Sequence, residues 1–158
     1  QSLAELLERD DAMSWLSEAQ TDALLRLANP LHRARIDQAL ARGERQVAAG
    51  YRRVRREGEG KAQRLELRFD GLAGCLRTPA GGSSRQFILV CEAGQVRARR
   101  LTAREAARLM GVPDGYVLPQ REGAGLKLMG DAVAVPVVRA LSAGLLLPAL
   151  RSGARAAA

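Results

Sequence analysis

The chain has 158 residues, the size of one ordinary domain, and its formal net charge is +8 at pH 7. Hydrophobic residues make up 47% of the sequence but aromatic residues only 3%, so we expect a modest core of Leu, Val and Ala. Pro136, Arg139 and Pro148 interrupt the most apolar stretch, which argues against a membrane span, and we expect no membrane partner. The chain begins at Gln1 without the basic-then-apolar order of a signal peptide, which favours a segment of a cytoplasmic protein.

The positive charge is concentrated in one part of the chain. Residues 1–31 are acidic, whereas residues 33–68 are strongly basic, and nearly every cation is an arginine. Arginines neutralise phosphates and release counterions, so nucleic acid is the expected partner, although a GC-rich genome would also raise the arginine content. The asymmetry predicts one face for a protein neighbour or solvent and another for phosphates.

The first part of the sequence predicts helices. Apolar residues have helical spacing at 3–7, at 23–28 and again from about 31 to 49, where Gly43 weakens the pattern. Asn29-Pro30 separates the second helix from the third, because the residue before a proline is pushed out of the helical region. We therefore expect a helical segment over 1–60 that becomes basic toward its end.

The middle of the chain predicts strands. Apolar and charged residues alternate over 64–69, which is the pattern of a half-buried strand, and 73–77 and 87–90 read as two more strands. A tight turn is expected at 93–95. Cys75 and Cys91 fall on these strands without the spacing of metal ligands, so we expect buried, reduced thiols and no metal site.

The last third predicts helices again. Thr102 followed by Glu105 forms a capping box that opens a helix, and Gly111 and Pro113 end it. Residues 133–146 are apolar nearly all round, and such a helix needs burial on more than one side. The expected fold is α+β, with N-terminal helices, a small twisted antiparallel sheet and a C-terminal apolar helix.

Three segments carry a family resemblance: residues 68–78 with the loop at 81–86, residues 100–114, and residues 130–138. In this order they resemble the C-terminal region of bacterial DNA cytosine-5 methyltransferases. Residues 68–78, with the loop at 81–86, look like the target-recognition region of a subset of these enzymes. Residues 100–114 are similar to the penultimate motif of the family, R-x-L-T-x-R-E-x-A-R-L-x-G-[FY]-P, which is long and specific. Residues 130–138 resemble its last motif, G-N-[AS]-V-x-x-P-V, at the expected distance. The N-terminal part carries the resemblance only weakly, through residues 51–55.

The resemblance implies a division of the chain and a function. Residues 61–129 are expected to form the target-recognition region, and residues 130–158 a helix that packs on a catalytic domain outside this chain. The implied function is target recognition in duplex DNA for S-adenosylmethionine-dependent methylation of cytosine, of the restriction-modification type, in the bacterial cytoplasm.

The departures from the family pattern limit what this chain is expected to do. Asp131 stands where the pattern has Asn beside the S-adenosylmethionine pocket, and Val112 replaces Phe or Tyr. We expect Asp131, Ala132 and Val133 to reach that cofactor only with the catalytic domain present, and the chain alone to bind none. The Pro-Cys nucleophile loop, the Glu-Asn-Val segment and the Gly-rich cofactor loop of the family do not occur in these residues. The chain alone is therefore predicted not to be catalytic, and Glu105 to serve structure.

DNA contacts are expected from an arginine run that clamps phosphates and from the loop before residue 87. Arg85 can bond guanine O6 and N7 together, a contact worth roughly 1–3 kcal/mol of discrimination, and Gln86 could pair with adenine. In the family the target cytosine is flipped out of the stack while the recognition region holds the opened duplex. The predicted DNA-binding residues are Arg52, Arg53, Arg55, Arg68, Arg77, Thr78, Gly82, Ser83, Ser84, Arg85 and Gln86.

Other functions remain open at this point. The chain could be a stand-alone DNA-binding or interaction module, which would bind a specific duplex tightly without a partner. It could also be the non-catalytic subunit of a split methyltransferase. An RNA-methylating relative would suit the charge equally well, although the loop at 81–86 looks more like that of the DNA enzymes. An independent enzyme of another class is disfavoured, because no nucleophile, base and orienting residue come together in the pattern.

Overall fold

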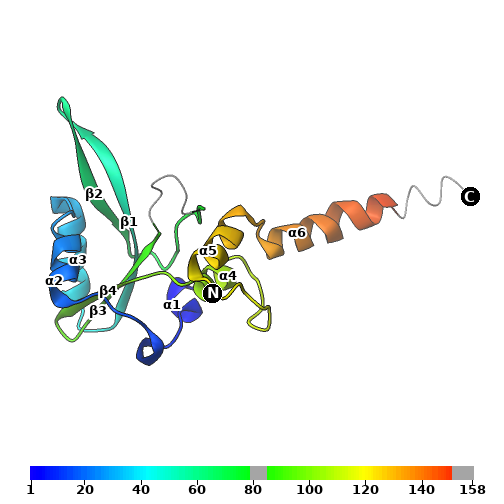
Figure 1. The fold of residues 1–158 in the computed structure, drawn as a ribbon, viewed down its shortest axis with the longest axis horizontal. Coiled ribbons are helices and arrows are strands. Elements are labelled where there is room, and N and C mark those ends of the chain that lie inside the picture. Colours follow the sequence, from blue (N-terminus) through cyan, green and yellow to red (C-terminus); the bar gives the residue numbers. More distant parts are fainter. Residues whose placement is uncertain (79–84, 151–158) are drawn as a thin grey trace, which may run out of the picture.

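The computed structural model describes residues 1–78 and 85–150, in which helices flank a four-stranded sheet (Figure 1). The elements before the sheet are α1 (Leu3–Leu6), the 3-10 turn η1 (Asp10–Ala12), α2 (Glu18–Leu25) and α3 (Pro30–Ala41). The strands are β1 (Gln46–Glu57), β2 (Gly60–Arg68), β3 (Phe87–Glu92) and β4 (Gln95–Arg100). After the sheet come α4 (Ala103–Leu109), α5 (Glu122–Asp131), α6 (Val135–Leu141) and its π-helical continuation η2 (Ser142–Leu146). The predicted α+β fold is confirmed.

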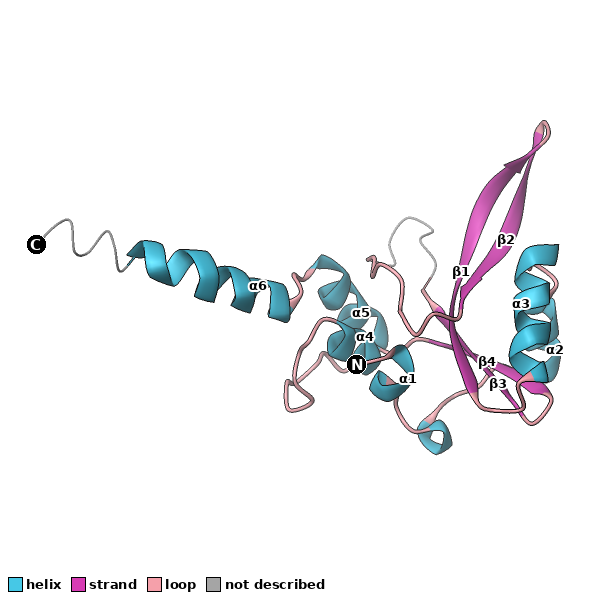
Figure 2. Cartoon of the chain, turned by 180° about the vertical axis from the view of Figure 1, so that it is seen from behind, coloured by secondary structure: helices cyan, strands magenta, loops and turns pink. Residues whose placement is uncertain are grey.

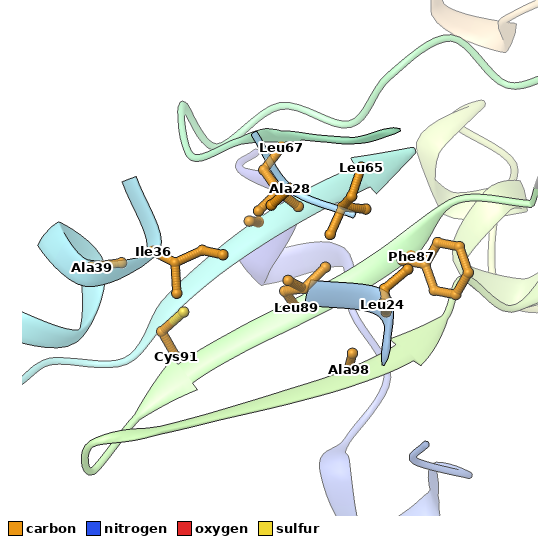
Figure 3. Packing of buried hydrophobic residues seen from close by; sticks show 11 residues of the cluster. Leu24, Ala28, Ile36, Ala39, Leu65, Leu67, Phe87, Leu89, Cys91 and Ala98 are labelled. Carbon is orange, nitrogen blue, oxygen red and sulfur yellow. The ribbon is translucent and has the colours of Figure 1, made fainter. Parts of the chain in front are cut away.

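The sheet has the order β2-β1-β3-β4, every neighbouring pair is antiparallel, and both faces are covered. Helices α2 and α3 cover one face, where Leu24 and Ile36 pack with Leu89 and Cys91 of β3 (Figure 3). Helices α1, α4 and α5 cover the other face, where Ile88 and Val90 are buried. The apolar side chains on both sides are almost all aliphatic, as the composition predicts.

Only the first part of β1 lies inside the sheet. Residues 46–50 of β1 pair with β3, whereas residues 51–57 pair with β2 alone. The outer parts of β1 and β2 therefore form a two-stranded ribbon, whose turn end stands beyond the helices and the other strands (Figures 1 and 2). We call residues 51–57 and 60–66 the basic ribbon.

The predicted turn at 93–95 and the predicted capping box are confirmed. Ala93 and Gly94 both have positive φ, of 50° and 73°, as a two-residue type I′ hairpin turn requires. The Thr102 hydroxyl accepts a hydrogen bond from the N–H of Glu105, and the Glu105 carboxylate accepts one from the N–H of Thr102. The αL residue Gly111 follows the end of α4.

Two predicted elements are wrong. The third helix ends at Ala41 rather than near residue 49, because Gly43 turns the chain with φ 71°, and β1 begins at Gln46. The basic end of the predicted helical segment 1–60 is therefore a strand, whose pairing with β2 and β3 outweighs a weak helical period. Residues 73–77 form no strand, and Cys75 is exposed instead of buried. Cys91 is buried as predicted, and burial raises the pKa of its thiol to about 11.

The chain leaves the core at its C-terminal end. The helical stretch over 122–150, broken only at 132–134, is long and apolar enough to cross a membrane by length and composition, and an 18-residue window within it has a mean hydropathy of 1.9. This property is one of length and composition only, so the expectation of no membrane partner stays a prediction. The most apolar part of this stretch is not buried, and α6 projects away from the sheet (Figure 1).

Candidate nucleic-acid interface

The basic ribbon brings together the arginine run of β1 and the cations of β2. Residues directly opposite each other share a face, and Arg53 lies opposite Arg64 while Arg56 lies opposite Lys61. Like charges directly opposite each other destabilise a strand pair. The strand pairing thus concentrates positive charge on the ribbon.

One carboxylate serves two guanidinium groups on this ribbon. Glu66 forms ion pairs with both Arg55 and Arg53, and the Arg53 Nε lies 3.4 Å from the Glu66 Oε2. The two arginine side chains are about half exposed, at 49% and 52%. Exposed ion pairs of this kind contribute little to stability, so these guanidinium groups can exchange Glu66 for a phosphate at small cost. The predicted residues Arg53 and Arg55 are thus placed to bind an anion.

The base of the ribbon is tied to residues 70–74. Arg68, another predicted DNA-binding residue, binds Asp70 through both Nε and Nη2, at 2.9 and 2.6 Å, and its hydrogen bonds lower the pKa of Asp70. The ring of Tyr51 packs on Gly74 so closely that a Cβ at residue 74 would lie 0.7 Å from the Tyr51 hydroxyl oxygen. The ribbon therefore starts from an ordered base.

Gln86 and Arg85 do not lie free on a surface, as base-reading residues would. Gln86 is only 5% exposed, and its amide accepts from the N–H of Gly74 at 3.1 Å and donates to the carbonyls of Gly74 and Cys75. The sequence prediction that Gln86 pairs with adenine does not fit this geometry, because all of its hydrogen-bonding groups serve the fold. Arg85 donates to the Leu101 carbonyl at 2.5 Å and to Glu122 at 2.6 Å, so it is half-buried and already paired.

The last family motif contacts the predicted recognition segment directly. A Cβ at Gly130 would lie 2.4 Å from the backbone nitrogen of Thr78 and 2.7 Å from the carbonyl carbon of Arg77. The Thr78 hydroxyl donates a hydrogen bond to Asp131. Arg77 is exposed, and Gly82, Ser83 and Ser84 lie outside the described residues. Helix α5 thus binds Thr78 at its C-terminal end and Arg85 at its first residue, Glu122.

A buried ion pair that the sequence analysis did not single out joins the sheet to α4. The guanidinium of Arg99 donates two hydrogen bonds to Glu105, at 2.9 and 2.6 Å, and the two side chains are 1% and 0% exposed. The same carboxylate accepts from the N–H groups of Thr102 and Glu8, both at 3.0 Å. Glu105 therefore holds β4, the start of α4 and the N-terminal segment together, in line with the structural role expected for it.

The residues predicted to approach the cofactor lie at the break between α5 and α6. Asp131 is exposed and bonded to Thr78, Ala132 is half-buried, and Val133 is 67% exposed. Three hollows on the described surface are lined by other residues.

Comparisons with known proteins identify the family. Residues 20–146 match the family described as C-5 cytosine-specific DNA methylase. Among curated relatives, Type II methyltransferase M.HpaII of Haemophilus parainfluenzae is 48% identical over 42 residues, which are 27% of this chain and 12% of the relative. Type II methyltransferase M1.ScrFI of Lactococcus lactis subsp. cremoris is 40% identical over 48 residues, 30% of this chain and 12% of the relative.

A third relative, Type II methyltransferase M.SsoII of Shigella sonnei, is 38% identical over 55 residues, 35% of this chain and 14% of the relative. The matches therefore span less than a sixth of these relatives' own length. No solved structure matches the chain. Because the family match covers most of its residues, this chain belongs to the C-5 cytosine-specific DNA methylase family.

Proposed function

We propose that this chain is the target-recognition and C-terminal part of a DNA cytosine-5 methyltransferase of the restriction-modification type. It holds duplex DNA, while methyl transfer from S-adenosylmethionine takes place on a catalytic part outside these 158 residues. Family membership supports DNA cytosine methylation, and the names of the matched relatives, all Type II methyltransferases, support the restriction-modification class. By this reading the enzyme works in the bacterial cytoplasm.

The observation that carries the recognition role is the basic ribbon. The major groove of B-DNA is wide enough to admit a two-stranded ribbon. In the basic ribbon, residues 51–57 of β1 pair with β2 and with no other strand. Its cations come from both strands, so phosphates on both sides of a groove are within reach of the same element. The cations of the ribbon are Arg52, Arg53, Arg55, Arg56, Lys61 and Arg64.

The chemistry of the two thiols supports a catalytic part elsewhere. Cys91 is buried and the pKa of its thiol is raised to about 11, so the nucleophilic thiolate is scarce at neutral pH. Cys75 is exposed but follows Gly74 rather than a proline. Neither thiol matches the Pro-Cys nucleophile of the family.

The exposed C-terminal helix supports the same division. Helix α6 and its continuation expose apolar side chains, and those of Val137, Val138, Leu141 and Leu145 are 46–63% exposed. An exposed apolar surface of this kind usually marks a site where another protein surface binds. We assign this surface to the catalytic part, against which Asp131, Ala132 and Val133 would then complete the wall of the cofactor site.

Hydrogen–deuterium exchange with and without a random-sequence duplex tests the recognition role. We expect the duplex to slow exchange over residues 51–57 and 60–66, and the double variant Arg53→Gln/Arg55→Gln to lose most of that protection. Helix α6 serves as the internal reference, because it should exchange equally fast in both samples. Protection confined to α2 and α3, with the ribbon unchanged, would contradict the proposal.

A further inference from the structure

A cavity of about 450 Å³ lies where the segment after η1 crosses the ends of β3 and β4. Its size is in the range of small-molecule sites, roughly 300–1,000 Å³. Its wall carries three guanidinium groups, those of Arg85, Arg99 and Arg100, and one carboxylate, that of Glu122. Of the residues predicted to bind DNA, Arg85 alone is among those that line this cavity.

The positive charge of the wall exceeds what Glu122 on the wall and Glu105 behind it neutralise. Glu122 is bound to Arg85, and Arg99 is bound to Glu105. Arg100 has only a ring contact, 5.2 Å from the centroid of Phe87, and forms no ion pair with the residues that the structure describes. Burial lowers the pKa of Arg85, and the nearby charge of Arg100 lowers it further, so two cations stand close together here.

Arg99, which lines the cavity, has a donor without a hydrogen-bond acceptor in the described part of the chain, and its guanidinium carbon lies 5.5 Å from the centroid of the Trp15 ring. Arg99 is 1% exposed, and its Nε has no hydrogen-bond partner among the described residues, although the other two guanidinium nitrogens are bound. Leaving a buried charged donor unsatisfied is costly, so such a group favours an acceptor brought by a ligand. The excess charge and the open donor call for the same chemistry, an anion with several acceptor oxygens.

The part of the wall that residues 15 and 16 form is held in place by hydrogen bonds. The indole N–H of Trp15 donates to the Asp10 carbonyl at 3.1 Å, and the N–H of Leu16 donates to the Ala98 carbonyl at 2.8 Å. The Arg97 guanidinium lies 4.2 Å from the centroid of the Trp15 ring. The cavity is therefore built by residues that hold their places without a ligand, as preorganised sites are.

We propose that this cavity binds a phosphate group, with Arg100 as its main donor, Arg85 and Arg99 adding positive charge, and Trp15 beside them. The phosphate belongs either to a free nucleotide or to the backbone of bound nucleic acid. This site is separate from the basic ribbon, and the proposal stands whether or not the ribbon binds DNA.

Trp15 is the single tryptophan of the chain, so its fluorescence reports on this cavity. Titration with inorganic phosphate, at ionic strength held constant with chloride, should give a saturable change. Arg100→Gln should weaken binding about tenfold or more, the usual effect of losing a charge-assisted hydrogen bond, and Arg100→Lys should weaken it less. Arg33→Gln, an exposed change on α3, is the matched control and should bind phosphate like the parent chain. A response that does not saturate, or one that Arg100→Gln leaves unweakened, overturns the proposal.

Two competitors then identify the source of the phosphate. Displacement of phosphate by random-sequence duplex assigns the site to nucleic-acid backbone, whereas displacement by a nucleoside 5′-monophosphate alone assigns it to a free nucleotide. The protection of the basic ribbon by DNA is measured by hydrogen–deuterium exchange, which does not depend on the fluorescence of Trp15. A failure of this site and a failure of the recognition role are therefore distinguishable.

Discussion

Replacing Glu105 by Gln is expected to lower the free energy of unfolding by about 3–5 kcal/mol, the usual cost of removing one partner of a buried ion pair. Glu105 is fully buried and accepts four hydrogen bonds, two of them from Arg99. A glutamine keeps the shape but not the charge, so the guanidinium of Arg99 would remain buried without a counterion. The loss would loosen β4, α4 and the N-terminal segment together.

Urea denaturation of the parent chain and of Glu105→Gln measures this loss of stability. Glu44→Gln is the matched control, because Glu44 is exposed, and an exposed change of this kind usually alters stability by no more than about 0.5 kcal/mol. Equal stability of Glu105→Gln and Glu44→Gln would show that the Arg99–Glu105 pair does not hold these elements.

The same pair predicts a dependence on pH. Desolvation raises the pKa of Glu105, but hydrogen bonds from Arg99 and from the N–H groups of Thr102 and Glu8 outweigh it, and the net pKa is lowered from 4.5. A carboxyl with a depressed folded-state pKa contributes stability above its unfolded pKa, and that contribution is lost as the pH falls through the folded value. Below about pH 4.5 the parent chain should therefore lose more stability than Glu105→Gln does.

Replacing Gly130 by Ala is expected to destabilise the chain by about 1–3 kcal/mol, the cost of overpacking. The new Cβ would meet the backbone of Arg77 and Thr78 at 2.4–2.8 Å, and backbone cannot move aside as the end of a flexible side chain can. Any shift that relieves the clash would also strain the hydrogen bond between Thr78 and Asp131.

Gly123→Ala is the control within the same helix. Among the described residues, no atom outside the neighbouring backbone of its own helix lies within 4 Å of a Cβ at Gly123, so the better helix propensity of alanine should stabilise that variant by about 0.5–1 kcal/mol. Opposite signs for the two variants in urea denaturation would support the contact between the last family motif and the recognition segment. If Gly130→Ala is as stable as Gly123→Ala, that contact is absent in solution.

The sequence predicts best the elements whose signal is local. The capping box at Thr102 and Glu105 and the turn at Ala93-Gly94 depend on residues close together in the chain, and both are confirmed. The strand predicted over 73–77 is wrong because the backbone there bonds to the side chain of Gln86, a partner that sequence periodicity does not show. The helix predicted to residue 49 is wrong because pairing with β2 and β3, which follow later in the sequence, decides the conformation of residues 46–57.

The candidate site shows the same limit. The arginine run can be recognised in the sequence as a charge pattern. Its position on a two-stranded ribbon cannot, because that position depends on where the pairing of β1 with β3 ends. Arg99 alternates with Ala98 and so reads as a solvent-facing residue on a half-buried strand. It is buried because this sheet is covered on both faces. The sequence predicts Gln86 to lie on the surface, because a hydrogen bond between its side chain and the backbone of Gly74 cannot be recognised from residue types.

The most direct test of the account is the affinity of this chain for a fluorescent random-sequence duplex, measured across a range of salt concentrations. We predict that the affinity falls as salt rises, and that Arg53→Gln/Arg55→Gln reduces the slope of log affinity against log salt by about 1 for each phosphate that the variant no longer binds. Arg9→Gln/Arg139→Gln removes the same charge away from the ribbon and should keep the parent slope. An affinity that salt does not change, or equal slopes for the two double variants, would contradict DNA recognition by the ribbon.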